Sequence, residues 1–146
     1  MAAEDTPIRS TCHCGAITVT APRLPGYTNA CQCTICRRYG AAWAYYRPDE
    51  VRIETRPGAV ARQYVWGDRG ISFNFCDSCG CVCYWWPLEQ PPPPGSTDGE
   101  EYKMGINTNN MDPGLLKYVD RRFDYAVLKI PVRSKDTAHP EDHATY

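Results

Sequence analysis

The sequence has no long hydrophobic run, no excess of charge of either sign and few uninterrupted stretches long enough for a helix. No apolar segment approaches the roughly 18 residues that a membrane-spanning helix needs. Lys and Arg number 16 and Asp and Glu 17, so overall charge favours neither nucleic acid nor an anionic membrane as a partner. The 146 residues, punctuated by 13 prolines and 11 glycines, suit one domain that is long enough to bury a core.

The first five residues also lack the basic and apolar regions of a secretory signal. We therefore expect a cytoplasmic protein whose nine cysteines stay reduced. Clustered reduced cysteines are typical of metal ligands or catalytic thiols, and the odd count argues against a fully paired disulfide framework.

Seven of the nine cysteines fall into three short motifs. These are Cys12-x-Cys14-Gly15, Cys31-x-Cys33-x-x-Cys36 and Cys76-x-x-Cys79-Gly80. Closely spaced cysteines let thiolates reach one soft, tetrahedral metal ion from a tight turn. Seven ligands suffice for one closed four-cysteine zinc site and one three-cysteine site whose fourth position is open to water or a substrate sulfur.

The two outer motifs resemble zinc knuckles. Gly15 and Gly80 follow the last cysteine of each, where a knuckle commonly needs a positive φ that glycine adopts at low cost. Brought together, the outer motifs make a four-thiolate site that links the two halves of the chain and stabilises the fold. The middle motif has three thiols within six residues and can hold an ion alone.

The rest of the chain predicts a mainly β architecture, with turn signals every eight to twelve residues. Expected strands cover 16–20, 43–46, 51–54, 60–66, 71–75 and 81–86, with a hairpin turn at 67–70. Helical turns are expected only at 34–39 and 114–119. The proline-rich segment 91–99 is interpreted as a stiff surface connector and 134–146 as a flexible tail.

Taken in order, the motifs C-x-C-G-A, C-x-C-x-x-C-R-R-x-x-G-A and F-C-x-x-C-G resemble the glutathione-dependent formaldehyde-activating enzyme (Gfa) family. Centromere protein V carries a related domain. The resemblance covers about residues 8–125, within a single zinc-binding domain expected over 1–133. It implies a β-tent fold, in which twisted antiparallel sheets are bridged by a four-cysteine zinc site and helical turns are few and short.

The resemblance also implies two zinc ions with different roles. Structural ligands would be Cys12, Cys14, Cys76 and Cys79, and catalytic ligands Cys31, Cys33 and Cys36. The implied activity is that of a zinc-dependent carbon–sulfur lyase resembling S-hydroxymethylglutathione synthase, which joins glutathione reversibly to formaldehyde. Gln32 stands where many relatives have histidine, and Ser72-Phe73-Asn74 where relatives often have a basic residue. These departures leave room for another aldehyde or a secondary-metabolite intermediate.

Residues beside the triad are candidates for substrate contact. Arg37 and Arg38 could receive the carboxylates of glutathione as co-substrate, because guanidinium groups bind carboxylates in a bidentate manner; ordinary surface ion pairing is the alternative. Nearby aromatic residues belong either to the core or to a wall that suits a substrate bulkier than formaldehyde: Trp43, Tyr45, Tyr46, Trp85 and Trp86.

Two cysteines and one histidine stand outside this scheme. Cys81 and Cys83 are two apart on an expected strand and therefore share a face, which favours two small buried side chains. The alternative makes one of them a redox partner or a fourth ligand that closes the triad site. His13 is expected to point outward.

The expected partners are a small thiol and an aldehyde, with no nucleic acid and no membrane. The competing hypothesis is a non-catalytic zinc-binding module that acts through protein contacts. Nucleic-acid binding is disfavoured because the basic residues are dispersed and balanced by acidic ones.

Overall fold

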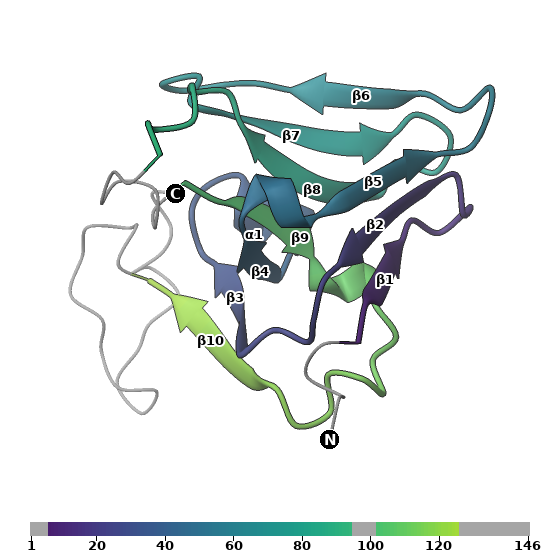
Figure 1. Ribbon diagram of the computed structural model, residues 1–146, viewed down its shortest axis with the longest axis vertical. Helices are drawn as coiled ribbons and strands as arrows, with labels where there is room; N and C mark the ends of the chain where they lie inside the picture. The colour runs from purple at the N-terminus through teal and green to yellow at the C-terminus, as the bar shows by residue number, and fades with distance from the viewer. Residues whose placement is uncertain (1–5, 95–101, 126–146) are drawn as a thin grey trace.

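The computed structural model describes residues 6–94 and 102–125, which form two β-sheets (Figure 1). The expected tail at 134–146, the end of the expected domain beyond residue 125 and the last part of the 91–99 connector lie outside the described residues. No helix within 6–94 or 102–125 is long and apolar enough to cross a membrane.

The smaller sheet has three antiparallel strands in the order β1-β2-β5. Its strands are β1 (Ile8–Thr11), β2 (Ile17–Ala21) and β5 (Arg52–Thr55). Alternate residues of β2 are buried, which is the pattern of a strand with one face on a core. The β1–β2 turn carries the first cysteine motif.

The larger sheet has seven strands in the order β10-β3-β4-β9-β8-β7-β6. They are β3 (Tyr27–Cys31), β4 (Trp43–Tyr46), β6 (Ala61–Tyr64), β7 (Ile71–Cys76), β8 (Val82–Pro87), β9 (Met104–Asn107) and β10 (Asp120–Asp124). Every neighbouring pair is antiparallel except β10–β3, which is parallel. Within 6–94 and 102–125 the helical elements are the short α1 (Cys36–Tyr39) and the 3-10 turns η2 (Pro48–Glu50) and η4 (Thr108–Asn110).

The mainly β prediction is confirmed, and each of the predicted strands overlaps an observed one. The hairpin turn at 67–70 joins β6 to β7, and the expected helical turn at 34–39 contains α1. Segment 114–119 forms successive hydrogen-bonded turns instead of a helix. The sequence interpretation missed β1, β3, β9 and β10.

The two faces of the larger sheet bury different cores. We call the core between the two sheets the first core; it contains Ile17 and Val19 of β2 together with Ala44 and Ile106 of the larger sheet. On the opposite face lies the second core, formed by Cys36, Ala41, Trp43, Phe73 and Val82. No second sheet covers that face among the described residues.

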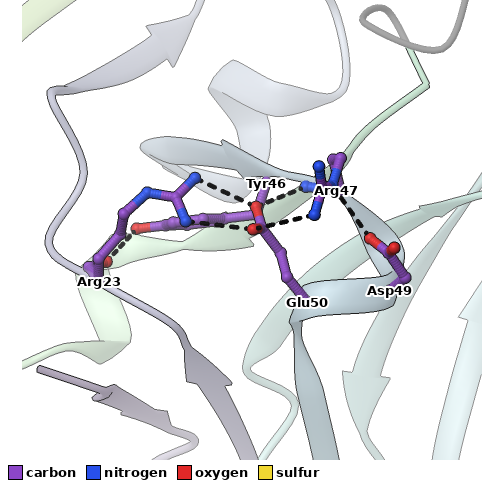
Figure 2. Close-up of polar contacts among 5 residues, drawn as sticks. All are labelled: Arg23, Tyr46, Arg47, Asp49 and Glu50. Atoms are coloured by element: carbon purple, nitrogen blue, oxygen red, sulfur yellow. Dashed lines mark hydrogen bonds and ion pairs between the residues drawn. The ribbon is translucent and has the colours of Figure 1, made fainter. Parts of the chain in front are cut away.

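A polar cluster ties the loop after β2 to the end of β4 (Figure 2). The Tyr46 hydroxyl donates to the Arg23 carbonyl at 2.9 Å, and the Arg23 guanidinium donates to both Glu50 oxygens at 3.1 and 3.2 Å. The backbone N–H of Arg47 donates to Glu50 Oε1 at 3.0 Å. Half-buried Glu50 therefore sits at the centre of this cluster.

We expect Glu50→Gln to destabilise the protein by about 1 kcal/mol, near the upper end for exposed ion pairs, because the carboxylate accepts several hydrogen bonds. Burial of the carboxyl opposes the effect, but the hydrogen bonds from Arg23 and Arg47 lower the pKa of Glu50 below its usual range. A lowered folded-state pKa gives stability that is complete above the unfolded value and is lost as pH falls through the folded value.

The difference between Glu50→Gln and the wild type should therefore stay constant between about pH 6 and pH 8, measured by urea unfolding. Glu54→Gln is the matched control, since its partner Arg52 is exposed and that pair should contribute little. Equal effects of the two substitutions would contradict the central role of Glu50.

Candidate metal centres and the cavity beside them

The four outer cysteines converge between the two sheets. Their sulfur atoms all lie within 4.8 Å of one another, with Cys12 to Cys14 at 3.8 Å and Cys14 to Cys76 at 3.6 Å. A tetrahedral ion with zinc–sulfur bonds of about 2.3 Å places its sulfurs about 3.8 Å apart. Both the thiolate donor set and its spacing therefore fit zinc.

Each outer motif adopts the conformation that its glycine was expected to allow. Gly15 has φ of 82° and Gly80 has φ of 77°, which confirms the prediction of positive φ at both positions. Their backbone N–H groups donate to the carbonyls of Cys12 and Cys76, closing two tight turns. Within the second turn the backbone N–H of Cys79 lowers the pKa of Cys76, which prepares that sulfur to act as a thiolate ligand.

This cluster connects the sheets. Cys12 and Cys14 lie in the β1–β2 turn of the smaller sheet, whereas Cys76 ends β7 of the larger sheet and Cys79 lies in the turn after it. The side chains of Cys12 and Cys76 are 3% and 1% exposed. Cys14 is exposed and Cys79 is half-buried. Thiols brought together from distant turns are what a fold-stabilising metal site requires.

The middle motif forms a second cluster on the opposite face of the larger sheet. Cys31 ends β3, Cys33 lies in the following turn and Cys36 begins α1, with the three sulfurs within 4.8 Å of one another. The N–H of Cys36 donates to Cys33 Sγ at 3.4 Å. Gly40, with φ of 65°, ends the helix and lets the chain turn back into β4.

The three thiols of the middle motif titrate as a group. Hydrogen bonds from Cys31 and then Cys36 lower the pKa of Cys33 to about 2. In return the pKa of Cys31 is raised, chiefly by its hydrogen bond with Cys33, and that of Cys36 chiefly by its hydrogen bond with Cys31. Three thiolates this close together repel one another, so all three ionise only around a cation; a coordinating metal ion displaces the thiol protons.

A cavity of about 720 Å³ opens beside the middle motif, whose three cysteines form part of its lining. Five of its lining residues are aromatic: Trp43, Tyr45, Trp66, Phe73 and Trp85. The larger sheet therefore presents three thiols and an aromatic surface to the same space.

Gly105 explains how two of these rings meet. It lies between Tyr45 on β4 and Trp85 on β8 in the strand register. A Cβ atom at this position would overlap the indole Nε1 of Trp85, so only glycine lets the indole lie against β9. The rings of Tyr45 and Trp85 are consequently neighbours, with centroids 6.0 Å apart.

The structure separates the aromatic residues that the sequence grouped. Trp43, Tyr45 and Trp85 line the cavity, whereas Tyr46 and Trp86 pack against the first core. The sequence interpretation did not identify Trp66 and Phe73 as cavity residues, although both lie in expected strands. It also missed Asn29 and Lys103, for which the sequence carries no local signal.

Arg37 and Arg38 are not among the described residues that line the cavity. Arg38 Nη1 donates to the carbonyl and hydroxyl oxygens of Thr34, each at 2.7 Å. Nε and Nη2 of Arg37 are buried without a hydrogen-bond partner in the described part of the chain. Contact of either residue with substrate stays a prediction.

Cys81 and Cys83 both pack against the first core, on the face opposite the middle motif. Cys83 is 2% exposed and its thiol donates to the Cys81 carbonyl at 3.4 Å. Their position removes the alternative in which one of them closes the three-cysteine site. His13 is exposed, as expected.

At the two departures from relatives, Gln32, Ser72 and Asn74 lie off the cavity lining, whereas Phe73 is part of it. Gln32 donates to the Ala30 carbonyl at 2.8 Å. Asn74 donates to both oxygens of Ser72 and lies on the side of β7 that faces the first core with Cys76.

Comparison with known proteins agrees with this geometry. Residues 7–95 match the family of glutathione-dependent formaldehyde-activating enzymes. The chain belongs to this family. A crystal structure of a Rhodobacter sphaeroides protein is similar to this Gfa-family chain at 26% sequence identity, with a TM-score of 0.59, covering 78% of this chain and 99% of that one. Curated proteins gave no match.

The two clusters of this Gfa-family protein should respond differently to substitution. We expect two zinc ions per chain, and loss of cooperative folding in Cys79→Ser, since a structural zinc contributes of order 10 kcal/mol in small zinc domains. Cys33→Ser should lose one zinc and keep its thermal transition. Metal analysis and calorimetry measure both quantities.

Cys81→Ser is the matched control, because Cys81 lies beside Cys79 but outside the four converging thiols. It should keep both ions. If Cys33→Ser unfolds the protein as Cys79→Ser does, the division between a structural and a functional cluster is wrong.

Proposed function

We propose that the protein is a zinc-dependent carbon–sulfur lyase or synthase that makes and breaks the adduct between a thiol and an aldehyde. The observation that carries this proposal is the position of Cys31, Cys33 and Cys36 in the lining of a cavity of about 720 Å³. Membership of the Gfa family supports it at the level of glutathione-dependent formaldehyde activation.

Zinc held by these three cysteines would supply a Lewis acid that lowers the pKa of a bound thiol or polarises a carbonyl group. In the forward reaction the S–H group adds across the carbonyl. The C–S bond forms, the π bond of the carbonyl breaks and the thiol proton ends on the oxygen. No oxidant or reductant is needed.

We assign Tyr45 as the group that binds the aldehyde oxygen. Its hydroxyl lies 2.7 Å from the side-chain amide of Asn29, and both residues line the cavity. Burial raises the pKa of Tyr45 to about 12, so the hydroxyl keeps that proton at neutral pH. A donor already in place can stabilise the charge that develops on oxygen as the C–S bond forms.

The competing hypothesis, a non-catalytic zinc-binding interaction module, expects a fully ligated second zinc. Cys81 and Cys83 were the candidate fourth ligands, and both pack on the opposite face of the sheet. We therefore infer that the partners are a small thiol and an aldehyde, with glutathione as the first thiol to test and Arg37 and Arg38 as its candidate carboxylate contacts.

The first experiment measures chemical exchange between formaldehyde, glutathione and their adduct by NMR exchange spectroscopy. The zinc-loaded protein should accelerate exchange above the spontaneous rate, and Cys33→Ser should remove the acceleration. Acceleration by the wild type and Cys33→Ser alike would overturn the assignment of the reaction to this cluster.

Tyr45→Phe should slow the accelerated exchange by about 100-fold, the usual loss when one donor to a developing oxyanion is removed. Zinc content should stay unchanged and the protein should still unfold cooperatively, because the ring remains, at a somewhat lower temperature because the buried Asn29 amide loses its partner. Tyr84→Phe is the control: it also removes one hydroxyl from the same sheet, on the face of the first core. Unchanged exchange in Tyr45→Phe would exclude the proposed role.

A further inference from the structure

A second cavity, of about 620 Å³, adjoins the cavity beside the three-cysteine cluster. Asp68, Ile71, Trp85 and Lys103 line both, so the two spaces are neighbours across these side chains. The far end of the second cavity is lined by Pro87, Glu89 and Pro92. We call these two neighbouring cavities together the groove; their lining extends from the three thiols to the proline-rich segment after β8.

The groove is far too large for formaldehyde alone. Formaldehyde has two heavy atoms and is little larger than water, which occupies about 30 Å³ in the liquid. A cavity of about 720 Å³ falls in the range that binds whole organic ligands.

The chemistry of the groove favours an aromatic ligand. Three of its rings are partly exposed, those of Tyr45, Trp66 and Trp85, and provide flat apolar surfaces; aromatic pairs gain about 0.5–1.5 kcal/mol beyond the burial of area. Its charged lining residues are the acids Asp68, Glu89 and Asp124 and the base Lys103. An acidic lining is unfavourable for a carboxylate on the aldehyde, and the carboxylates of glutathione would therefore lie outside the groove, where Arg37 and Arg38 are their candidate contacts.

We propose that the aldehyde used at the three-cysteine cluster carries an uncharged or cationic aromatic ring system, which lies in the groove along Trp66 and Trp85. This inference rests on the proposed thiol–aldehyde chemistry and adds to it the class of carbonyl compound. The step is the same addition of S–H across the carbonyl group. The aromatic ring system of the aldehyde is joined to its carbonyl carbon by a short alkyl linker.

Trp66 is the residue best placed to test the inference. It lies in the turn between β6 and β7, lines the cavity and is still 41% exposed, so a ligand has apolar surface to cover there. In the same turn Asp68 Oδ1 accepts from the Gly70 N–H at 3.0 Å, which holds the turn independently of the indole.

The binding experiment uses zinc-loaded protein and 2-(2-naphthyl)ethanol, an unreactive analogue of 2-naphthylacetaldehyde. Calorimetry should detect binding, weakened about three- to tenfold in Trp66→Ala. Tyr64→Ala is the control, an equally exposed aromatic residue of the same hairpin outside the cavity lining. The 6-carboxy derivative should bind more weakly than the parent alcohol. Equal binding to Trp66→Ala and wild type, or no binding, would overturn the inference.

The rate experiment compares 2-naphthylacetaldehyde with acetaldehyde, which has the same reacting group without the ring, each mixed with glutathione. Acceleration over the spontaneous exchange should be at least about tenfold larger for the naphthyl compound. Equal acceleration, or a preference for acetaldehyde or formaldehyde, would overturn the inference and leave the proposed function standing. No acceleration with any of the three aldehydes would overturn the proposed function itself.

Discussion

The convergence of Cys12, Cys14, Cys76 and Cys79 is the constraint on which the rest of the structure depends. These thiols come from one turn of each sheet, and their sulfur spacing matches the edge of a zinc tetrahedron. A zinc ion held by these four thiols would join one turn of each sheet and so fix how the two sheets pack over the first core between them.

Strand β7 transmits this constraint to the other face of the larger sheet. Its residues alternate, so Cys76 points to the first core while Ile71 and Phe73 belong to the second. Zinc bound at Cys76 would therefore hold the face of β7 that carries Phe73 toward the second core. The four-cysteine cluster thus positions part of the aromatic wall without touching the cavity.

A structural feature can be predicted from the sequence when it depends on residues close together in the chain. Positive φ at Gly15 and Gly80 is predictable because a knuckle turn closes within a few residues, and strand 43–46 follows from a short run of β-prone residues. By contrast, β10 (Asp120–Asp124) is polar and mostly exposed, and it becomes a strand only through parallel pairing with distant β3. Lys103 and Asn29 reach the cavity only through the strand order. The need for glycine at position 105 comes from Trp85 on the neighbouring strand, so the sequence of β9 alone does not predict it.

The second core differs from the first in having no covering sheet among the described strands. Instead, its buried aromatic residues Trp43 and Phe73 line the cavity, as does Trp66 of the β6–β7 turn, which is partly in solvent. A bound aromatic ligand would supply the apolar contacts that a covering layer supplies elsewhere, so its ring system would act as part of the core. Binding would then remove water from around the three thiols at the same time as it places the carbonyl near the Tyr45 hydroxyl. In this arrangement, the burial of the substrate body and the stabilisation of the developing charge on oxygen depend on the same wall of the larger sheet.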